Sequence, residues 1–157
     1  VPAQDALAEV LGRGTGPLYP RLVLEERLAV AAGAYADSAR LLNGEFLIYA
    51  SPTPVVALAD LRMPVEEEIE RLKDTLVSDA ELARAKVQLV SGLVFARDSQ
   101  QSMAQIFGRA AALGHAPSDV LQWPSEIEAV TRADVRAAAQ AFLQTPHSLT
   151  GHLLGTQ

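Results

Sequence analysis

The sequence has no cysteine, few aromatic residues and no excess of positive charge over its 157 residues. Because cysteine is absent, disulfide bonds and thiolate metal sites are excluded. Acidic residues outnumber basic residues by 19 to 13, and the net charge of −6 argues against nucleic acid or an anionic membrane surface as a partner. No apolar run approaches the roughly 20 residues that span a bilayer. We therefore expect neither nucleic acid nor a membrane among the partners.

The remaining composition is that of a globular protein. Apolar residues make up 49% of the chain and charged residues 20%, and the length suffices for one domain with a hydrophobic core. The chain begins at Val1–Pro2 and enters a helical pattern at once, with Ala3, Leu7 and Val10 on one face. We expect residues 1–157 to form a single domain that is a piece of a longer polypeptide.

Hydrophobic periodicity predicts helices on either side of a β-hairpin. Strands at about 28–36 and 45–50 are expected to pair antiparallel around a turn at Asn43–Gly44. Capping-box patterns at Ser78–Glu81 and Thr131–Asp134 mark the starts of two later helices. The other expected elements are a first helix at 3–11, a helix that runs to about Leu76, one bent helix or two helices up to Gly114, a short helix or turn at 117–123 before Pro124, and a closing strand at 148–154.

This order of elements contains no repeated strand–helix–strand alternation. It favours an α+β fold with a mostly antiparallel sheet flanked by helices. In the helix before Leu76, Glu66–Glu68 are expected to face water, because consecutive helix residues point in different directions and cannot converge on one metal ion. The residues expected to be buried there are Val65, Ile69, Leu72 and Leu76, and in the last helix they are Val135, Ala138, Ala139 and Phe142.

No catalytic or metal-binding group is visible in the residue pattern. His115 lies in a predicted loop, and the five-residue separation of His147 and His152 places them on opposite faces of the expected closing strand. No Gly-x-Ser-x-Gly elbow offers a serine nucleophile, and Gly14 and Gly16 lack the strand–turn–helix context of a phosphate site. From the pattern alone we predict no catalytic, cofactor-binding or metal-binding residue.

Residues 18–30 are the part of the chain most able to carry a function. A glycine-rich run at 11–16 leads into a charged amphipathic helix, which passes almost without a loop into the first predicted strand. Because the connection is so short, the last helical turn and the first strand residues must lie side by side. Functional side chains on either side of this helix–strand junction would be held rigidly.

Three segments of the chain together resemble peptidase family M16, the insulinase or pitrilysin type. They are the glycine-rich loop, charged helix and strand start at 11–30, the helix at 77–89 with its Glu-Leu-x-x-Ala-Lys-x-x-Leu pattern, and the closing pattern at 119–135. The resemblance is to the second, non-zinc domain and covers nearly the whole chain. It implies an α+β fold of the LuxS/MPP-like metallohydrolase type, in which such domains close around a peptide substrate.

Two functional features of the family are missing from this chain. The family's zinc site is an inverted His-x-x-Glu-His motif in the first domain, and no such motif occurs here. Zinc is therefore expected in an absent N-terminal domain or a partner subunit, with no cofactor in this chain. The family further uses an Arg and a Tyr seven residues apart across the junction; the matching positions are Val23 and Val30, which cannot donate hydrogen bonds. Nearby donors are out of register, namely Arg21, Arg27, Tyr19 and Tyr35.

Without these donors the chain resembles the zinc-bearing subunit of two-subunit bacterial members, in which the other subunit supplies the Arg and the Tyr. We expect a non-catalytic C-terminal domain of an M16-like zinc metalloendopeptidase that forms part of a peptide-binding chamber. Its expected partners are a peptide substrate and an M16-like subunit, or a second copy in a homo-oligomer. The alternatives are an inactive M16-like structural or assembly subunit and an unrelated α+β interaction module. The compartment, bacterial periplasm or cytoplasm, stays open.

Overall fold

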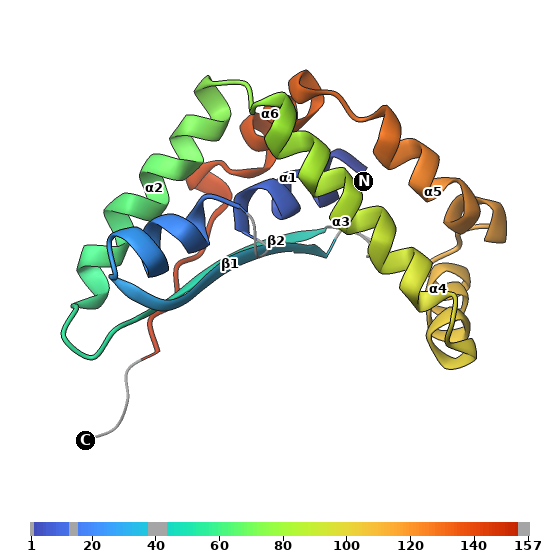
Figure 1. The fold of residues 1–157 in the computed structure, drawn as a ribbon, viewed down its shortest axis with the longest axis horizontal. Helices are drawn as coiled ribbons and strands as arrows, with labels where there is room; N and C mark the ends of the chain where they lie inside the picture. Colours follow the sequence, from blue (N-terminus) through green and yellow to red (C-terminus); the bar gives the residue numbers. More distant parts are fainter. Residues whose placement is uncertain (1, 13–15, 38–43, 154–157) are drawn as a thin grey trace.

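Helices cover one face of a two-stranded antiparallel sheet (Figure 1) in the computed structural model, which describes residues 2–12, 16–37 and 44–153. This confirms the predicted α+β class and the predicted hairpin. No described helix is both long and apolar enough to cross a membrane. The elements are α1 (Pro2–Gly12), η1 (Pro20–Glu25), β1 (Ala29–Asp37), β2 (Glu45–Pro52), α2 (Leu58–Asp74), α3 (Asp79–Ala96), α4 (Gln100–Ala112), α5 (Pro117–Ala129), α6 (Arg132–Phe142) and η2 (Thr145–His147).

The core is organised around α1, which lies between the sheet and the outer helices and contacts β1, α3, α5 and α6. Leu7 and Leu11 of α1 are fully buried, as are Leu72 of α2 and Val135 of α6. A Cβ at Gly12 would lie 2.0 Å from the backbone nitrogen of Ala34. Only glycine therefore permits the end of α1 to approach β1 this closely.

The hairpin has one covered face and one open face. Ala32 and Ala34 of β1 are buried, and they stand opposite Ala50 and Ile48 of β2, which pack against the core. On the other face Gly33 stands opposite Tyr49, whose hydroxyl would lie 2.7 Å from a Cβ at Gly33. The tyrosine ring thus fills the space that the glycine leaves. This open face carries three exposed large side chains, Val30, Tyr35 and Tyr49.

Both predicted capping boxes are present. The Ser78 backbone N–H donates to Glu81 at 2.7 Å, and the Glu81 N–H donates to the Ser78 hydroxyl at 3.1 Å. Thr131 and Asp134 make the same reciprocal pair at the start of α6, at 2.8 and 3.2 Å. These bonds satisfy backbone donors that a helix start leaves free, so local sequence fixes where α3 and α6 begin.

Several sequence-based expectations are corrected. Residues 148–153 form no strand and Leu149 and Leu153 are almost fully exposed, because no described strand lies beside them; Leu154 lies outside the described residues, as does Asn43 of the expected turn. Pro124 lies inside α5 and does not restart the chain, since the fully buried Ile127 anchors the helix beyond it. Phe142 and Leu76 are exposed. The polar break after Ala96 separates two helices.

Candidate functional site at the helix–strand junction

The backbone of the junction is irregular at three successive points. The turn η1 is a π-helix, in which the Glu26 N–H donates to the Arg21 carbonyl at 2.8 Å. Arg27 then adopts a φ of 53°, a left-handed conformation that is uncommon for a residue with a Cβ. The pairing of β1 with β2 shifts between Ala29 and Ala31, which makes Val30 the extra residue of a bulge. Such irregularities persist only where the surroundings hold them, and they concentrate at functional sites.

Arg21 ties the junction to α2. Its Nε donates to Glu26 Oε1 at 2.7 Å, its Nη2 pairs with Glu67, and its Nη1 lies 3.4 Å from Glu68 Oε1. The hydrogen bond to Glu26, followed by the one to Glu67, raises the pKa of the Arg21 guanidinium. Each of the three nitrogens of the Arg21 guanidinium thus has a carboxylate partner, which holds the side chain against Glu26 and α2.

Glu68 continues the ion pairs from α2 to α3. Only 7% of the residue is exposed, and its Oε2 accepts from Arg71 Nε at 2.8 Å. Arg71 in turn lies 3.4 Å from Glu81 of the α3 capping box. Burial opposes ionisation of Glu81, but the hydrogen bonds from Ser78 and the charges of Arg71 and Arg84 outweigh it and lower its pKa. The prediction that Glu68 faces water is therefore wrong, because Arg21 and Arg71 pair with the carboxylate and offset the cost of burying its charge.

The two valines expected at the family's Arg and Tyr positions lie in different environments. Val23, in η1, is half-buried and packs against the core, whereas Val30, at the start of β1, is 59% exposed. Leu24 is also 60% exposed, so two apolar side chains lie on the surface of the junction together with the exposed Glu25, Glu26 and Arg27. Among the nearby donors, Arg27 is exposed and Tyr35 lies further along β1 on the open sheet face.

The histidines do not form a metal centre with acidic residues in the described part of the chain. Nδ1 of His115 lies 3.7 Å from Asp119 in an exposed pair, His147 ends η2, and His152 is exposed in the C-terminal segment. No group of three or more His, Asp or Glu side chains that could hold a metal ion occurs among the described residues. The junction offers for contact two exposed apolar side chains, Leu24 and Val30, among charged neighbours, on a backbone that the ion pairs of Arg21 tie to α2.

Sequence reasoning did not find the ion-pair frame. Glu68 and Arg71 have the three-residue spacing that permits a pair on one helix face, and this was the available signal. Arg21 is 46 and 47 residues away from Glu67 and Glu68. No local pattern predicts a contact over that separation.

The α+β architecture agrees with the comparison with known families. The sequence profile of the peptidase M16 inactive domain matches residues 1–89, which is more than half of the chain. The chain belongs to peptidase family M16 and is a domain of the inactive type. Zinc in this family belongs to the catalytic domain. The alternative hypothesis of an unrelated α+β interaction module is therefore wrong. A comparison with curated protein sequences finds no significant match.

Solved structures show the same fold at low sequence identity. The inactive peptidase domain of a candidate zinc protease from Bordetella parapertussis superposes with a TM-score of 0.86 at 21% identity, over 99% of this chain and 84% of that one. A protease from Helicobacter pylori superposes with a TM-score of 0.83 at 22% identity. The match covers 91% of this chain but only 34% of the Helicobacter chain. A chain of Complex III2 from Candida albicans superposes with a TM-score of 0.69 at 21% identity, over 88% of this chain and 35% of the Candida chain. This chain thus spans about a third of the Helicobacter and Candida chains.

Proposed function

We propose that this domain forms part of the wall of a peptide-binding chamber in an M16 zinc peptidase and that it contributes no catalytic group. Residues 1–157 would be one domain of a longer polypeptide, with the zinc-binding motif in an N-terminal domain. The observation that carries the proposal is the match of residues 1–89 to the inactive domain of the family. Two solved structures with this fold are named as domains or chains of zinc proteases, which supports the same class.

The junction supports a passive role within that chamber. We propose that Val23 and Val30 stand where the family has its Arg and Tyr, so that neither the reacting carbonyl nor the peptide receives a hydrogen bond here. Val30 and Leu24 would instead make apolar contacts to the peptide or to a partner M16-like subunit, from a surface with exposed fractions near 60%. Arg21 would keep this surface in place through its three carboxylate partners.

Peptide cleavage by the complete enzyme tests the proposal. We expect Val30→Glu to raise KM with little change in kcat, because the charge weakens peptide contact without touching the reacting atoms. Val55→Glu is the matched control, since Val55 is 93% exposed in the turn before α2 and should leave both constants unchanged. A fall in kcat with unchanged KM would instead place Val30 beside the reacting atoms and would contradict the passive role.

The second candidate function is an inactive M16-like assembly subunit. Its support is the structural likeness to a chain of the Candida complex, with a TM-score of 0.69. The sequence upstream of this domain separates the two candidates. An intact His-x-x-Glu-His motif there favours the peptidase, and a degenerate motif favours the assembly subunit.

A further inference from the structure

Helix α3 has one buried face and one exposed face that is also apolar. Leu82 and Ala85 are buried and Leu89 packs against the core. On the opposite side Val87 is 62% exposed, Val94 52% and Phe95 74%. In Figure 1 this helix crosses the front of the molecule with no other element over it. We call the exposed side the outer α3 face. Its members are Arg84, Val87, Val94 and Phe95, together with the half-buried Ser91 and with Asp98 in the turn that follows α3.

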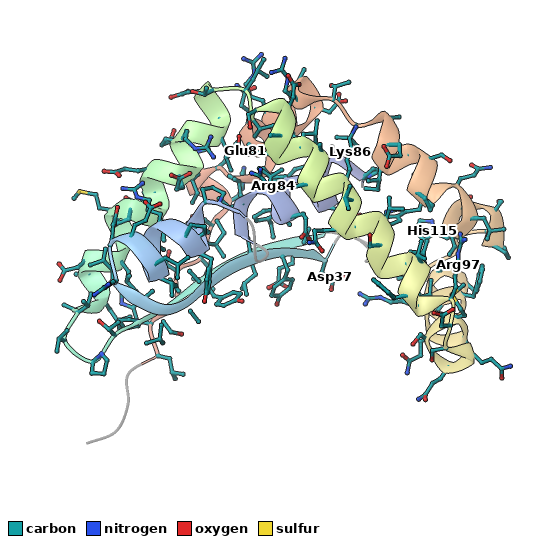
Figure 2. All side chains as sticks on the ribbon, viewed as in Figure 1. Asp37, Glu81, Arg84, Lys86, Arg97 and His115 are labelled. Atoms are coloured by element: carbon teal, nitrogen blue, oxygen red, sulfur yellow. The ribbon has the colours of Figure 1, made fainter. Side chains whose placement is uncertain are left out.

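The spacing within the outer α3 face is that of a helix pair. Arg84 and Ser91 are seven residues apart on α3 and therefore project from the same side. Asp98 comes seven residues later, in the turn that follows α3, where its N–H donates to the Phe95 carbonyl at 3.2 Å and continues the helical path. Ser91 lies midway between two opposite charges. Arg84 projects from α3 in Figure 2 and, like Asp98, makes no side-chain hydrogen bond or ion pair with any residue that the structure describes. One exposed face thus carries apolar anchors and two opposite charges that form no ion pair with another described residue, although the charge of Arg84 contributes to the lowered pKa of Glu81.

We propose that the outer α3 face binds the same face of a second copy of this chain, with the two α3 helices antiparallel about a two-fold axis at Ser91. In that arrangement Arg84 of each copy faces Asp98 of the other, because both lie seven residues from the axis. Phe95 of each copy faces Val87 of the other, where Ala83, Arg84, Val87 and Gln88 line a shallow, mainly apolar hollow. The charges of the outer α3 face are therefore complementary to those of a second copy, which favours a second copy over an unrelated protein as the partner.

The proposed contact is small. Helix α3 has 18 residues and is about 27 Å long, so one helix pair forms an interface at the low end of the specific range. We expect a weak dimer that appears with rising protein concentration. This inference does not rest on the chamber proposed above, since it uses only α3, and it stands or falls by different measurements.

Sedimentation equilibrium of the chain tests the dimer and its charges. Val87→Glu should weaken dimerisation by about tenfold or more, since two buried carboxylates would face apolar groups. Arg84→Asp and Asp98→Arg should each weaken it by placing like charges together, and the double variant should restore it. Val55→Glu, exposed but on another surface, is the control and should have no effect.

The absence of cysteine allows a second, geometric test. Ser91→Cys should form an intermolecular disulfide under mild oxidation, because the two copies of residue 91 meet at the axis. Ser125→Cys, at an exposed position of α5, should not. A monomer at all concentrations overturns the proposal, as does a dimer that is insensitive to Val87→Glu and to the charge exchange. Binding of a different M16 domain to this face in place of a second copy also overturns it.

Discussion

The helices differ in how much of each is buried. We call the part around α1 the packed half, and α4 and α5 the extended half. In α1, seven of eleven residues are buried, from Ala6 to Gly12, whereas α4 has no buried residue and contacts mainly α5. Figure 1 shows α4 and α5 extending beyond the end of the sheet. The match to the inactive M16 domain ends at residue 89, before α4 begins. The matched part thus includes α1, the hairpin and α2, whereas α4 lies outside it and is tied to β1 by the ion pair from Arg109 to Asp37 at 2.6 Å.

The largest difference between the halves should appear on truncating a leucine. Leu11→Ala removes a fully buried side chain of α1 and should lower the free energy of unfolding by about 2–5 kcal/mol. Leu121→Ala removes a 59% exposed side chain of α5 and should change it by about 0.5 kcal/mol or less. Urea denaturation measures both. Equal losses would show that the extended half is as tightly packed as the core.

The ion pairs of the packed half should be next in size. Glu68→Gln leaves Arg21 and Arg71 without their shared carboxylate, and the free energy of unfolding should fall by about 1–3 kcal/mol. The matched control is Glu66→Gln, which breaks an exposed pair with Arg62 and should cost about 0.5 kcal/mol or less. If the two variants lose the same amount in chemical denaturation, the frame around Arg21 contributes no more than a surface pair.

Replacing a glycine by alanine should change the free energy of unfolding in opposite directions in the two halves. Gly12→Ala places a Cβ 2.0 Å from the Ala34 backbone and should destabilise the protein by about 1–3 kcal/mol. Gly108→Ala, in α4, meets no atom within 4 Å and should stabilise it by about 0.5–1 kcal/mol through better helix propensity. The midpoint of thermal unfolding should therefore fall in Gly12→Ala and rise in Gly108→Ala. A stable Gly12→Ala variant would contradict the close approach of α1 to β1.

The smallest effect concerns the capping boxes at low pH. The pKa of Glu81 and that of Asp134 are both below their ordinary values of 4.5 and 3.8. A lowered pKa in the folded state gives a stabilisation that is present above the ordinary pKa and is lost as the pH falls below it. The free energy of unfolding should therefore decline below about pH 4.5. Glu81→Gln should make that decline shallower, while Glu128→Gln, which alters an exposed acid of α5, should not.

The parts of the fold that could be predicted from the sequence depend on neighbours in the chain. The hairpin strands alternate in the expected way, and the capping boxes involve residues three positions apart. Burial of Glu68 could not be predicted, because its partner Arg21 comes from a distant segment. The continuation of α5 through Pro124 could not be predicted either, because it depends on the tertiary packing of Ile127. The same holds for residues 148–153, because a strand there would need a neighbouring strand to pair with. At the site, the apolar character of Val23 and Val30 is visible in the sequence, whereas the π-turn and the bulge that present them are not.

We propose that this M16 domain has no peptidase activity on its own. The most direct test is to measure zinc content and peptide hydrolysis on the purified chain. We expect no stoichiometric zinc and no hydrolysis above the uncatalysed rate, with or without added zinc. Stoichiometric zinc together with hydrolysis that a chelator abolishes would contradict it.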